Sequence, residues 1–143
     1  MSHVTYHIYF HVVFSTKRRL PILSRQTIRI INKTIHELAN EIGFRLVASG
    51  GYDDHLHLLI SLPPHHNVAT VIKRIKGRTF RENAGLYWQT GYYAETVSGS
   101  GVAALTDYIL NQWEKHSLRS LEEAGFFERF GAKSPWATWF DKL

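Results

Sequence analysis

The order of apolar and polar positions predicts strands and helices that follow one another along the chain. Residues 4–14 alternate with a period of two and are rich in β-branched and aromatic side chains, which is typical of a strand. One face of this strand would carry Val4, Tyr6, Ile8, Phe10, Val12 and Phe14, and the other Thr5, His7, Tyr9, His11 and Val13. The basic run STKRRLP that follows predicts a turn, because Pro21 interrupts regular structure.

Helical spacing follows this turn. Ser24 is a suitable N-cap and Gly43 a suitable stop for a helix whose apolar stripe is Ile28, Ile31, Ile35, Leu38 and Ile42. Asn67 can cap a second helix with Val68, Val71, Ile72 and Ile75 on one side and basic residues over the rest. A third helix is expected over residues 102–116, after the flexible run SGSG at 98–101, and a short one over 118–130.

Three further strands complete the pattern. They are expected over residues 44–48, ending at Gly50 and Gly51, over 55–62, closed by Pro63 and Pro64, and over 88–97. The resulting order β-α-β-β-α-β-α predicts an α+β fold, a ferredoxin/RRM-like sandwich with a mostly antiparallel sheet and helices packed on it. No repeat or linker divides the 143 residues, so a single domain over 1–143 is expected.

Composition narrows the class of protein. Apolar residues make up 44% of the chain, but no apolar run approaches the roughly 20 residues of a membrane helix. The absence of cysteine excludes disulfides and thiolate metal sites, and with no secretion-signal pattern at the start it fits a cytoplasmic protein. Residues 1–90 carry 12 Lys and Arg against 5 Asp and Glu, whereas 91–143 carry 5 against 7. A basic body indicates either a polyanionic partner or a merely solubilising surface.

The stretch DDHLHLLI at 53–60 holds the clearest candidate chemistry. On a strand, His55 and His57 point from one face with Cα atoms about 6.6 Å apart, while the leucines between them enter the core. Two neutral imidazoles can hold one divalent cation if at least one more ligand joins them. The alternative is an ordinary pair of strand histidines, because short motifs often occur without a function.

The helix VAALTDYILNQWEKH is the second candidate feature. Its stripe of Val102, Leu105, Ile109, Trp113 and His116 is expected to be the buried face. Tyr108 and Gln112 lie four residues apart on the flank beside that stripe, with Lys115 continuing it, so a tyrosine there can point into a cleft or be half-buried without a function. A phenol with a pKa near 10 is a poor nucleophile, but it can attack a phosphodiester that a cation polarises. Such an attack stores the broken bond as a phosphotyrosine for rejoining.

Several segments together resemble one family. They are YHIYFHVVFSTKRRLPIL, DDHLHLLISLPP, VIKRIKGRTFRE, WQTGYYAETVS and YILNQWEKH, in the family's order over about residues 4–116. The chain resembles the HUH single-tyrosine transposases of small bacterial and archaeal insertion sequences, the IS200-like proteins often called TnpA, and the related REP-associated tyrosine transposases. The tail 117–143 matches nothing in this pattern; its aromatic cluster is expected to pack on the body or on a partner subunit.

The resemblance implies a site and a reaction. It implies that His55, His57 and Gln112 are ligands of Mg²⁺ or Mn²⁺, and that Tyr108 is the nucleophile. It also implies cleavage and rejoining of single-stranded DNA at hairpin-bearing element ends, through a 5′-phosphotyrosine with a free 3′-OH. Family members are homodimers, and in some the tyrosine helix serves the His pair of the other subunit. The SGSG run is compatible with such a movement or with a plain loop.

Further candidates concern DNA contacts. The basic residues proposed for phosphates, which can equally be solvated surface, are Lys17, Arg18, Arg19, Lys73, Arg74, Lys76 and Arg78. His7, Tyr9 and His11 either line a DNA face or pack under a helix, and Trp88, Tyr92 and Tyr93 either stack on bases or belong to the core. Asp54 either orients an imidazole or caps a turn. Glu95 receives no role from the sequence.

Rival functions remain open at this point. One is an HUH-type nicking enzyme or a domesticated relative; another is a nucleic-acid-binding module without catalysis, in which Tyr108 is dispensable. A third is a metal-dependent phosphoesterase that uses water and forms no covalent adduct. The hairpin, the cleavage site, the target, continued mobility, and whether one subunit forms the whole active site do not follow from the sequence.

Overall fold

A four-stranded antiparallel sheet is the centre of the computed structural model, which describes residues 7–117 and 135–143. The strands are β1 (Ile8–Ser15), β2 (Arg45–Tyr52), β3 (His55–Leu62) and β4 (Tyr93–Val97). They lie in the order β2-β3-β1-β4, and every neighbouring pair is antiparallel. This arrangement confirms the predicted α+β sandwich.

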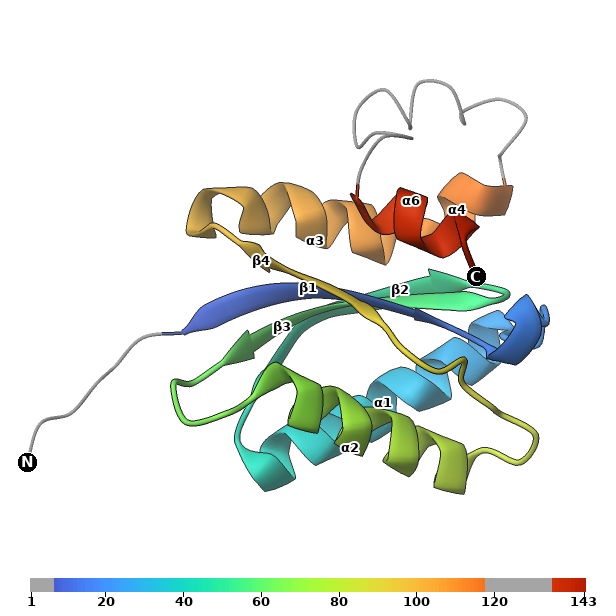
Figure 1. The fold of residues 1–143 in the computed structure, drawn as a ribbon, viewed down its shortest axis with the longest axis horizontal. Helices are drawn as coiled ribbons and strands as arrows, with labels where there is room; N and C mark the ends of the chain where they lie inside the picture. The colour runs from blue at the N-terminus through green and yellow to red at the C-terminus, as the bar shows by residue number, and fades with distance from the viewer. Residues whose placement is uncertain (1–6, 118–134) are drawn as a thin grey trace, which may run out of the picture.

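Helices cover both faces of the sheet (Figure 1). On one face lie α1 (Arg25–Ile42) and α2 (Val68–Glu82); on the other lie α3 (Val102–Leu110), α4 (Gln112–Ser117) and α6 (Pro135–Asp141). Two short 3-10 turns, η1 (Lys17–Arg19) and η2 (Gly99–Gly101), follow β1 and β4. None of the helices in the described part of the chain is both long and apolar enough to cross a membrane.

The predicted alternation of β3 divides its side chains between two cores. Leu56, Leu58, Ile60 and Leu62 are buried against α1 and α2, together with the apolar stripes of these helices. The opposite face of β3 carries His55, His57 and Leu59, and the core there contains Tyr108, Ile109, Trp136 and Phe140. The histidine pair therefore lies beneath the helices of the C-terminal third of the chain.

The predicted helix ends are confirmed. The Ser24 hydroxyl accepts a hydrogen bond from the Thr27 amide at 3.0 Å, and Asn67 caps α2 by accepting from the amides of Ala69 and Thr70. Gly43 ends α1 with a φ of 85°, a left-handed conformation that glycine adopts without a steric cost.

Two predicted strand boundaries were wrong. Strand β2 runs through Gly50 and Gly51 to Tyr52 because these glycines permit close contacts and do not form a turn. A Cβ on Gly50 would lie 2.0 Å from the carbonyl oxygen of Ile109. Strand β4 begins at Tyr93; Trp88 makes only an isolated bridge to Thr16, and Gly91, with a φ of 92°, lies in the interruption.

The helix predicted over 102–116 is divided at Asn111, whose φ of −101° and ψ of 15° leave the helical region. Its side-chain amide donates to the Asp107 carbonyl at 2.7 Å, so it competes with the regular helical pattern. The predicted buried stripe is confirmed at Ile109, but Leu105 is only half-buried, and Tyr108 and Gln112, which were expected on the flank, are buried. Because Gly50 has no side chain, the helix approaches β2 closely at Ile109.

Two predictions lie outside the described residues: the short helix over 118–130 and the start of the first strand at residues 4–6. The aromatic end of the tail is described, and it packs on the body of the same chain through Trp136 and Phe140.

Candidate active site

His55 and His57 lie side by side on the central strand β3. His55 pairs with Ser15 of β1 and Tyr52 of β2, and His57 with Val13 and Gly50, so backbone ladders hold both from two sides. Their ring centroids are 5.2 Å apart, and the two side chains are almost inaccessible to solvent. The predicted common face is therefore confirmed.

The other two candidates reach this pair from the helices above. The Gln112 Oε1 atom lies 3.4 Å from His55 Nε2, and the Tyr108 ring stands perpendicular to the His57 ring with 5.6 Å between centroids. The Gln112 amide nitrogen donates to the Tyr108 carbonyl at 3.4 Å, which directs Oε1 toward His55. One cluster thus contains His55, His57, Tyr108 and Gln112, although the first and last of these lie 57 positions apart in the sequence.

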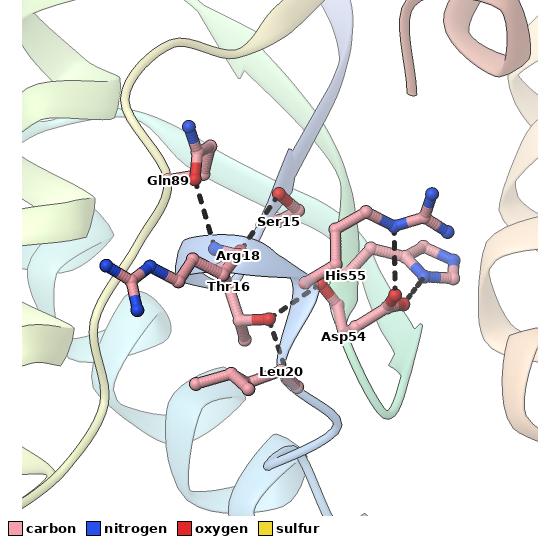
Figure 2. A network of polar contacts seen from close by, with 8 residues as sticks. Ser15, Thr16, Arg18, Leu20, Asp54, His55 and Gln89 are labelled. Atoms are coloured by element: carbon pink, nitrogen blue, oxygen red, sulfur yellow. Dashed lines mark hydrogen bonds and ion pairs between the residues drawn. The ribbon is translucent and has the colours of Figure 1, made fainter. Parts of the chain in front are cut away.

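His55 is oriented by Asp54. The Asp54 carboxylate accepts a hydrogen bond from His55 Nδ1 at 2.9 Å and another from Arg19 Nε at 3.2 Å (Figure 2). Burial by itself raises the pKa of Asp54, but its hydrogen bond with His55 and the nearby positive charges outweigh that effect and keep the pKa below its usual range. Because Nδ1 of His55 is bound to Asp54, Nε2 is the ring nitrogen that faces Gln112.

Tyr108 is buried among aromatic rings. Burial raises the pKa of its phenol above the usual value, and Gln112 lowers it by a smaller amount. The phenol is therefore neutral at physiological pH, so attack by its oxygen requires an acceptor for the proton or a group that stabilises the developing charge.

Helix α6 covers the outer side of the pair. Trp136 packs on His57 with 4.7 Å between ring centroids, and Phe140 packs on His55 at 4.9 Å. The Arg19 guanidinium lies 4.0 Å from the centre of the Phe140 ring. These side chains separate the two histidine rings from solvent on this side.

The two imidazoles and the amide could together hold a divalent cation. Within residues 7–117 and 135–143, no three His, Cys, Asp or Glu side chains form a metal-binding group, so a third protein ligand must be an amide or a backbone group. Gln112 Oε1 lies 3.4 Å from His55 Nε2, so the amide oxygen and the imidazole nitrogen are close enough to bind one cation together.

The basic candidates differ in their surroundings. Lys17, Arg18, Lys73 and Arg74 are exposed. Lys76 is half-buried and donates to the carbonyls of Gln89 and Gly91; burial lowers its pKa. Arg78 donates two hydrogen bonds to Glu41 at 2.7 and 3.2 Å. Lys76 and Arg78 thus hold the fold together, while the first four are available to phosphates.

Sequence reasoning missed one row of residues beneath the site. His11 is buried, with its Nε2 2.9 Å from His57 Nδ1 and its Nδ1 3.2 Å from Glu95 Oε1. Tyr93 donates to the other oxygen of Glu95 at 2.8 Å. The strand alternation contained a signal, because it placed His11 on the face away from the aliphatic core, but the neighbouring strands could not be identified from it.

The fold and the site define a class of protein: a small α+β sandwich with a strand-borne histidine pair facing a helix-borne tyrosine and glutamine. The family described as "Transposase IS200 like" matches residues 4–112, and the chain belongs to this family of transposases. The resemblance inferred from the sequence motifs is thereby confirmed.

Named relatives support the same family. The chain is 25% identical over 130 residues to the transposase for insertion sequence element IS200 of Salmonella typhimurium, covering 82% of this chain and 85% of the relative. It is 24% identical over 122 residues to the ISDra2 transposase TnpA of Deinococcus radiodurans, covering 77% and 87%.

Solved structures share the fold. A crystal structure of a putative transposase from Deinococcus radiodurans R1 matches with a TM-score of 0.62 and 26% identity, over 79% of this chain and 96% of that one. A REP-associated tyrosine transposase bound to a REP hairpin matches with a TM-score of 0.57 and 18% identity, over 78% and 71%.

Proposed function

We propose that this transposase cleaves and rejoins single-stranded DNA through a covalent 5′-phosphotyrosine at Tyr108. The observation that carries the proposal is the approach of Tyr108 and Gln112 to the histidine pair, with 5.6 Å between the rings of Tyr108 and His57. Transposition requires that strands be cut and joined again without an energy cofactor. A phosphotyrosine meets this requirement because the energy of the broken phosphodiester is retained in the new one.

His55, His57 and Gln112 would hold Mg²⁺ or Mn²⁺. The cation would polarise the scissile phosphate and stabilise charge on its oxygens. Asp54 binds Nδ1 of His55 and thereby keeps Nε2 turned toward Gln112. The Gln112 amide, anchored on the Tyr108 carbonyl, couples the position of the ligand to that of the nucleophile.

Tyr108 would attack the phosphorus and displace the 3′ oxygen. The phenol gives up its proton as the bond to phosphorus forms, and the departing 3′ oxygen gains one proton, so the step is balanced and yields a 3′-OH. In rejoining, a different 3′-OH attacks the phosphotyrosine and releases the phenol. The buried aromatic surroundings of Tyr108 would exclude water, which otherwise hydrolyses the intermediate.

The proposed substrate is the set of hairpin-bearing ends of the chain's own insertion sequence. Shape and unpaired bases would be recognised rather than a long duplex sequence, and the proposed assembly is a homodimer. The 5.6 Å between the rings of Tyr108 and the chain's own His57 supports a site formed within one subunit.

Covalent capture tests the proposal. Labelled single-stranded DNA from the element's ends is mixed with wild type, with Tyr108→Phe, and with wild type in EDTA. The expected result is an adduct that survives SDS, requires Mg²⁺ or Mn²⁺, and is absent from the variant. Cleavage without any adduct would favour the water-dependent phosphoesterase. Tight binding without cleavage, unchanged by Tyr108→Phe, would favour the non-catalytic module.

A further inference from the structure

A continuous chain of side-chain hydrogen bonds runs from strand β4 to His57. Tyr93 donates to Glu95, Glu95 pairs with His11, and His11 pairs with His57, at 2.8, 3.2 and 2.9 Å. The sheet register creates this row, because His11 lies directly opposite Glu95 and diagonally from His57 on the same face. The arrangement therefore rests on backbone pairing.

The chemistry of Glu95 sets the direction of these bonds. The hydrogen bond from His11 lowers the pKa of Glu95, with burial opposing and Tyr93 reinforcing the effect, so the group is a carboxylate that only accepts. His11 therefore donates to Glu95 through Nδ1, and its Nε2 pairs with Nδ1 of His57 at 2.9 Å. Since Nδ1 of His57 is bound to His11, a cation would bind this ring through Nε2.

We infer that Glu95 and His11 are positioning residues that fix the tautomer and ring orientation of His57, so that His57 binds the cation through Nε2. This inference rests on the proposed function, which makes His57 a ligand. Both histidines are then oriented by a carboxylate that acts on Nδ1. Asp54 binds Nδ1 of His55 directly, and Glu95 acts on Nδ1 of His57 through His11. Partners of this kind orient metal-binding histidines and increase their basicity.

The substitution Glu95→Gln tests the inference with two readouts other than activity. In metal-free protein, ¹⁵N NMR should show His57 protonated on Nδ1 in wild type and a mixture of tautomers in the variant, with the His57 signal assigned from His57→Gln. Mn²⁺ affinity measured by calorimetry should fall roughly 10- to 100-fold. Glu41→Gln is the matched control, because Glu41 loses the same charge but pairs with Arg78 on the opposite face of the sheet.

The possible results distinguish the positioning role of Glu95 from the proposed binding of metal. Wild-type tautomer and wild-type affinity in Glu95→Gln would overturn the inference. A purely structural role would lower the melting temperature without redistributing the tautomers, and it would overturn the inference too. If wild type bound no Mn²⁺, the proposed metal function would fail, while the metal-free NMR comparison would still decide whether Glu95 sets the tautomer.

An independent observation concerns a cavity of about 470 Å³ between α2 and the segment after it. Its walls combine aromatic rings with cationic side chains: Phe80, Tyr87, Trp88, Tyr92, Lys73 and Lys76. Phe80 and Tyr87 are 46% and 54% exposed although their ring centroids are only 5.4 Å apart, so apolar ring surface remains open to solvent. Exposed aromatic rings beside lysines are suited to a base and its phosphate.

Hydrogen bonds on both sides of the turn at residues 16–18 connect Gln89 to His55 (Figure 2). Gln89, which lines the cavity, accepts from the Arg18 amide at 3.1 Å, and Thr16 donates to the Asp54 carbonyl at 3.3 Å. Asp54 in turn holds His55. Lys17 and Arg18 are exposed on the intervening turn and border a second hollow that shares Tyr87.

We propose that this cavity binds an unpaired base of the single-stranded DNA that leads away from the scissile phosphate. Tyr87 and Phe80 would stack on the base, Lys73 would contact its phosphate, and Lys17 and Arg18 would hold the strand between the cavity and His55. The positive charge beside open aromatic surface favours a nucleic acid over an apolar peptide. The proposal rests on the proposed function for its choice of partner.

Binding measured without catalysis tests this site. In a Tyr108→Phe background, fluorescence anisotropy with an oligonucleotide from the element's end should show a loss of roughly 5- to 100-fold on Tyr87→Ala, the range that stacking on one base provides. Ile30→Ala is the control, because Ile30 is a similarly exposed apolar residue on α1. Equal affinities for Tyr87→Ala and Ile30→Ala would overturn the assignment. If Tyr87→Ala in the chain with Tyr108 intact still forms the covalent adduct at saturating DNA, the loss of affinity concerns the cavity and not the chemistry at Tyr108.

Discussion

His55 Nε2 and Gln112 Oε1 face each other at 3.4 Å between a central strand and the first turn of α4. The contacts with Asp54 and with the Tyr108 carbonyl fix the direction of each atom. The pair thus joins strand β3 to α4, which follows directly after α3 and its proposed nucleophile Tyr108. Binding of a cation there would tie the helix to the sheet.

This relationship predicts that divalent metal stabilises the folded protein. Mn²⁺ at 100 times its dissociation constant should increase the free energy of unfolding by about 2.7 kcal/mol, and EDTA should reverse the gain. The gain should disappear in His55→Ala and remain in His36→Ala, because His36 is an exposed histidine on α1. Thermal unfolding with and without Mn²⁺ measures the gain in stability. Equal gains in His55→Ala and His36→Ala would contradict a cation site at His55.

The close contact at Gly50 predicts opposite effects for two glycine substitutions. Gly50→Ala should destabilise the protein by about 1–3 kcal/mol, because the new Cβ would meet the backbone of Ile109 at 2.0 Å. Gly77→Ala should stabilise it by about 0.5–1 kcal/mol, since Gly77 lies inside α2 with no atom within 4 Å of an added Cβ. Denaturant unfolding of the two variants checks the packing of α3 on β2; a neutral Gly50→Ala would show that α3 lies farther away.

Glu95 gives a pH dependence with a definite sign. Its pKa in the folded protein is lower than the ordinary 4.5, mainly because His11 donates to it, so folding favours the charged form. The stability that Glu95 contributes is therefore complete above its unfolded pKa and is lost as the pH falls through the folded value. Denaturant unfolding in EDTA should show Glu95→Gln less stable than wild type at pH 7, with the difference shrinking below pH 4.5. A difference that grew toward acid would contradict this assignment.

The surroundings of the cations predict which ones contact DNA. Lys73→Ala should reduce the slope of log affinity against log salt by about 1, because an exposed lysine that neutralises a phosphate releases about one counterion. Arg78→Ala should leave that slope unchanged, since its guanidinium is bound to Glu41. Anisotropy titrations of single-stranded DNA at several salt concentrations compare the two variants. Equal changes in slope for the two variants would show that pairing with Glu41 does not keep Arg78 from contacting DNA.

Local rules predicted much of the fold. Ser24, Asn67 and Gly43 marked helix ends correctly because capping depends on neighbouring residues. The alternation of β3 placed His55 and His57 on one face for the same reason. The antiparallel sandwich followed from the order of these elements.

Predictions failed where distant segments meet. Gly50 was interpreted as a strand end, whereas it is needed for the approach of Ile109, which lies far along the chain. Tyr108 was placed on a flank because helical periodicity does not include the neighbouring strands. The hydrogen bonds that join Glu95, His11 and His57 depend on the order and register of the strands. The packing of Trp136 on His57 depends on where the end of the chain lies. Neither contact follows from a local sequence pattern.

The most direct test of the account identifies the residue that becomes joined to DNA. Protein is allowed to react with single-stranded DNA from the element's ends in Mn²⁺, trimmed with nuclease and trypsin, and sequenced by tandem mass spectrometry. The peptide over residues 82–115 contains Tyr87, Tyr92, Tyr93 and Tyr108, so fragmentation distinguishes the nucleophile from tyrosines outside the histidine site. The account predicts a nucleotide joined through its 5′ phosphate to Tyr108, and none in EDTA. A nucleotide on any other residue, or DNA cleavage with every tyrosine unmodified, would contradict it.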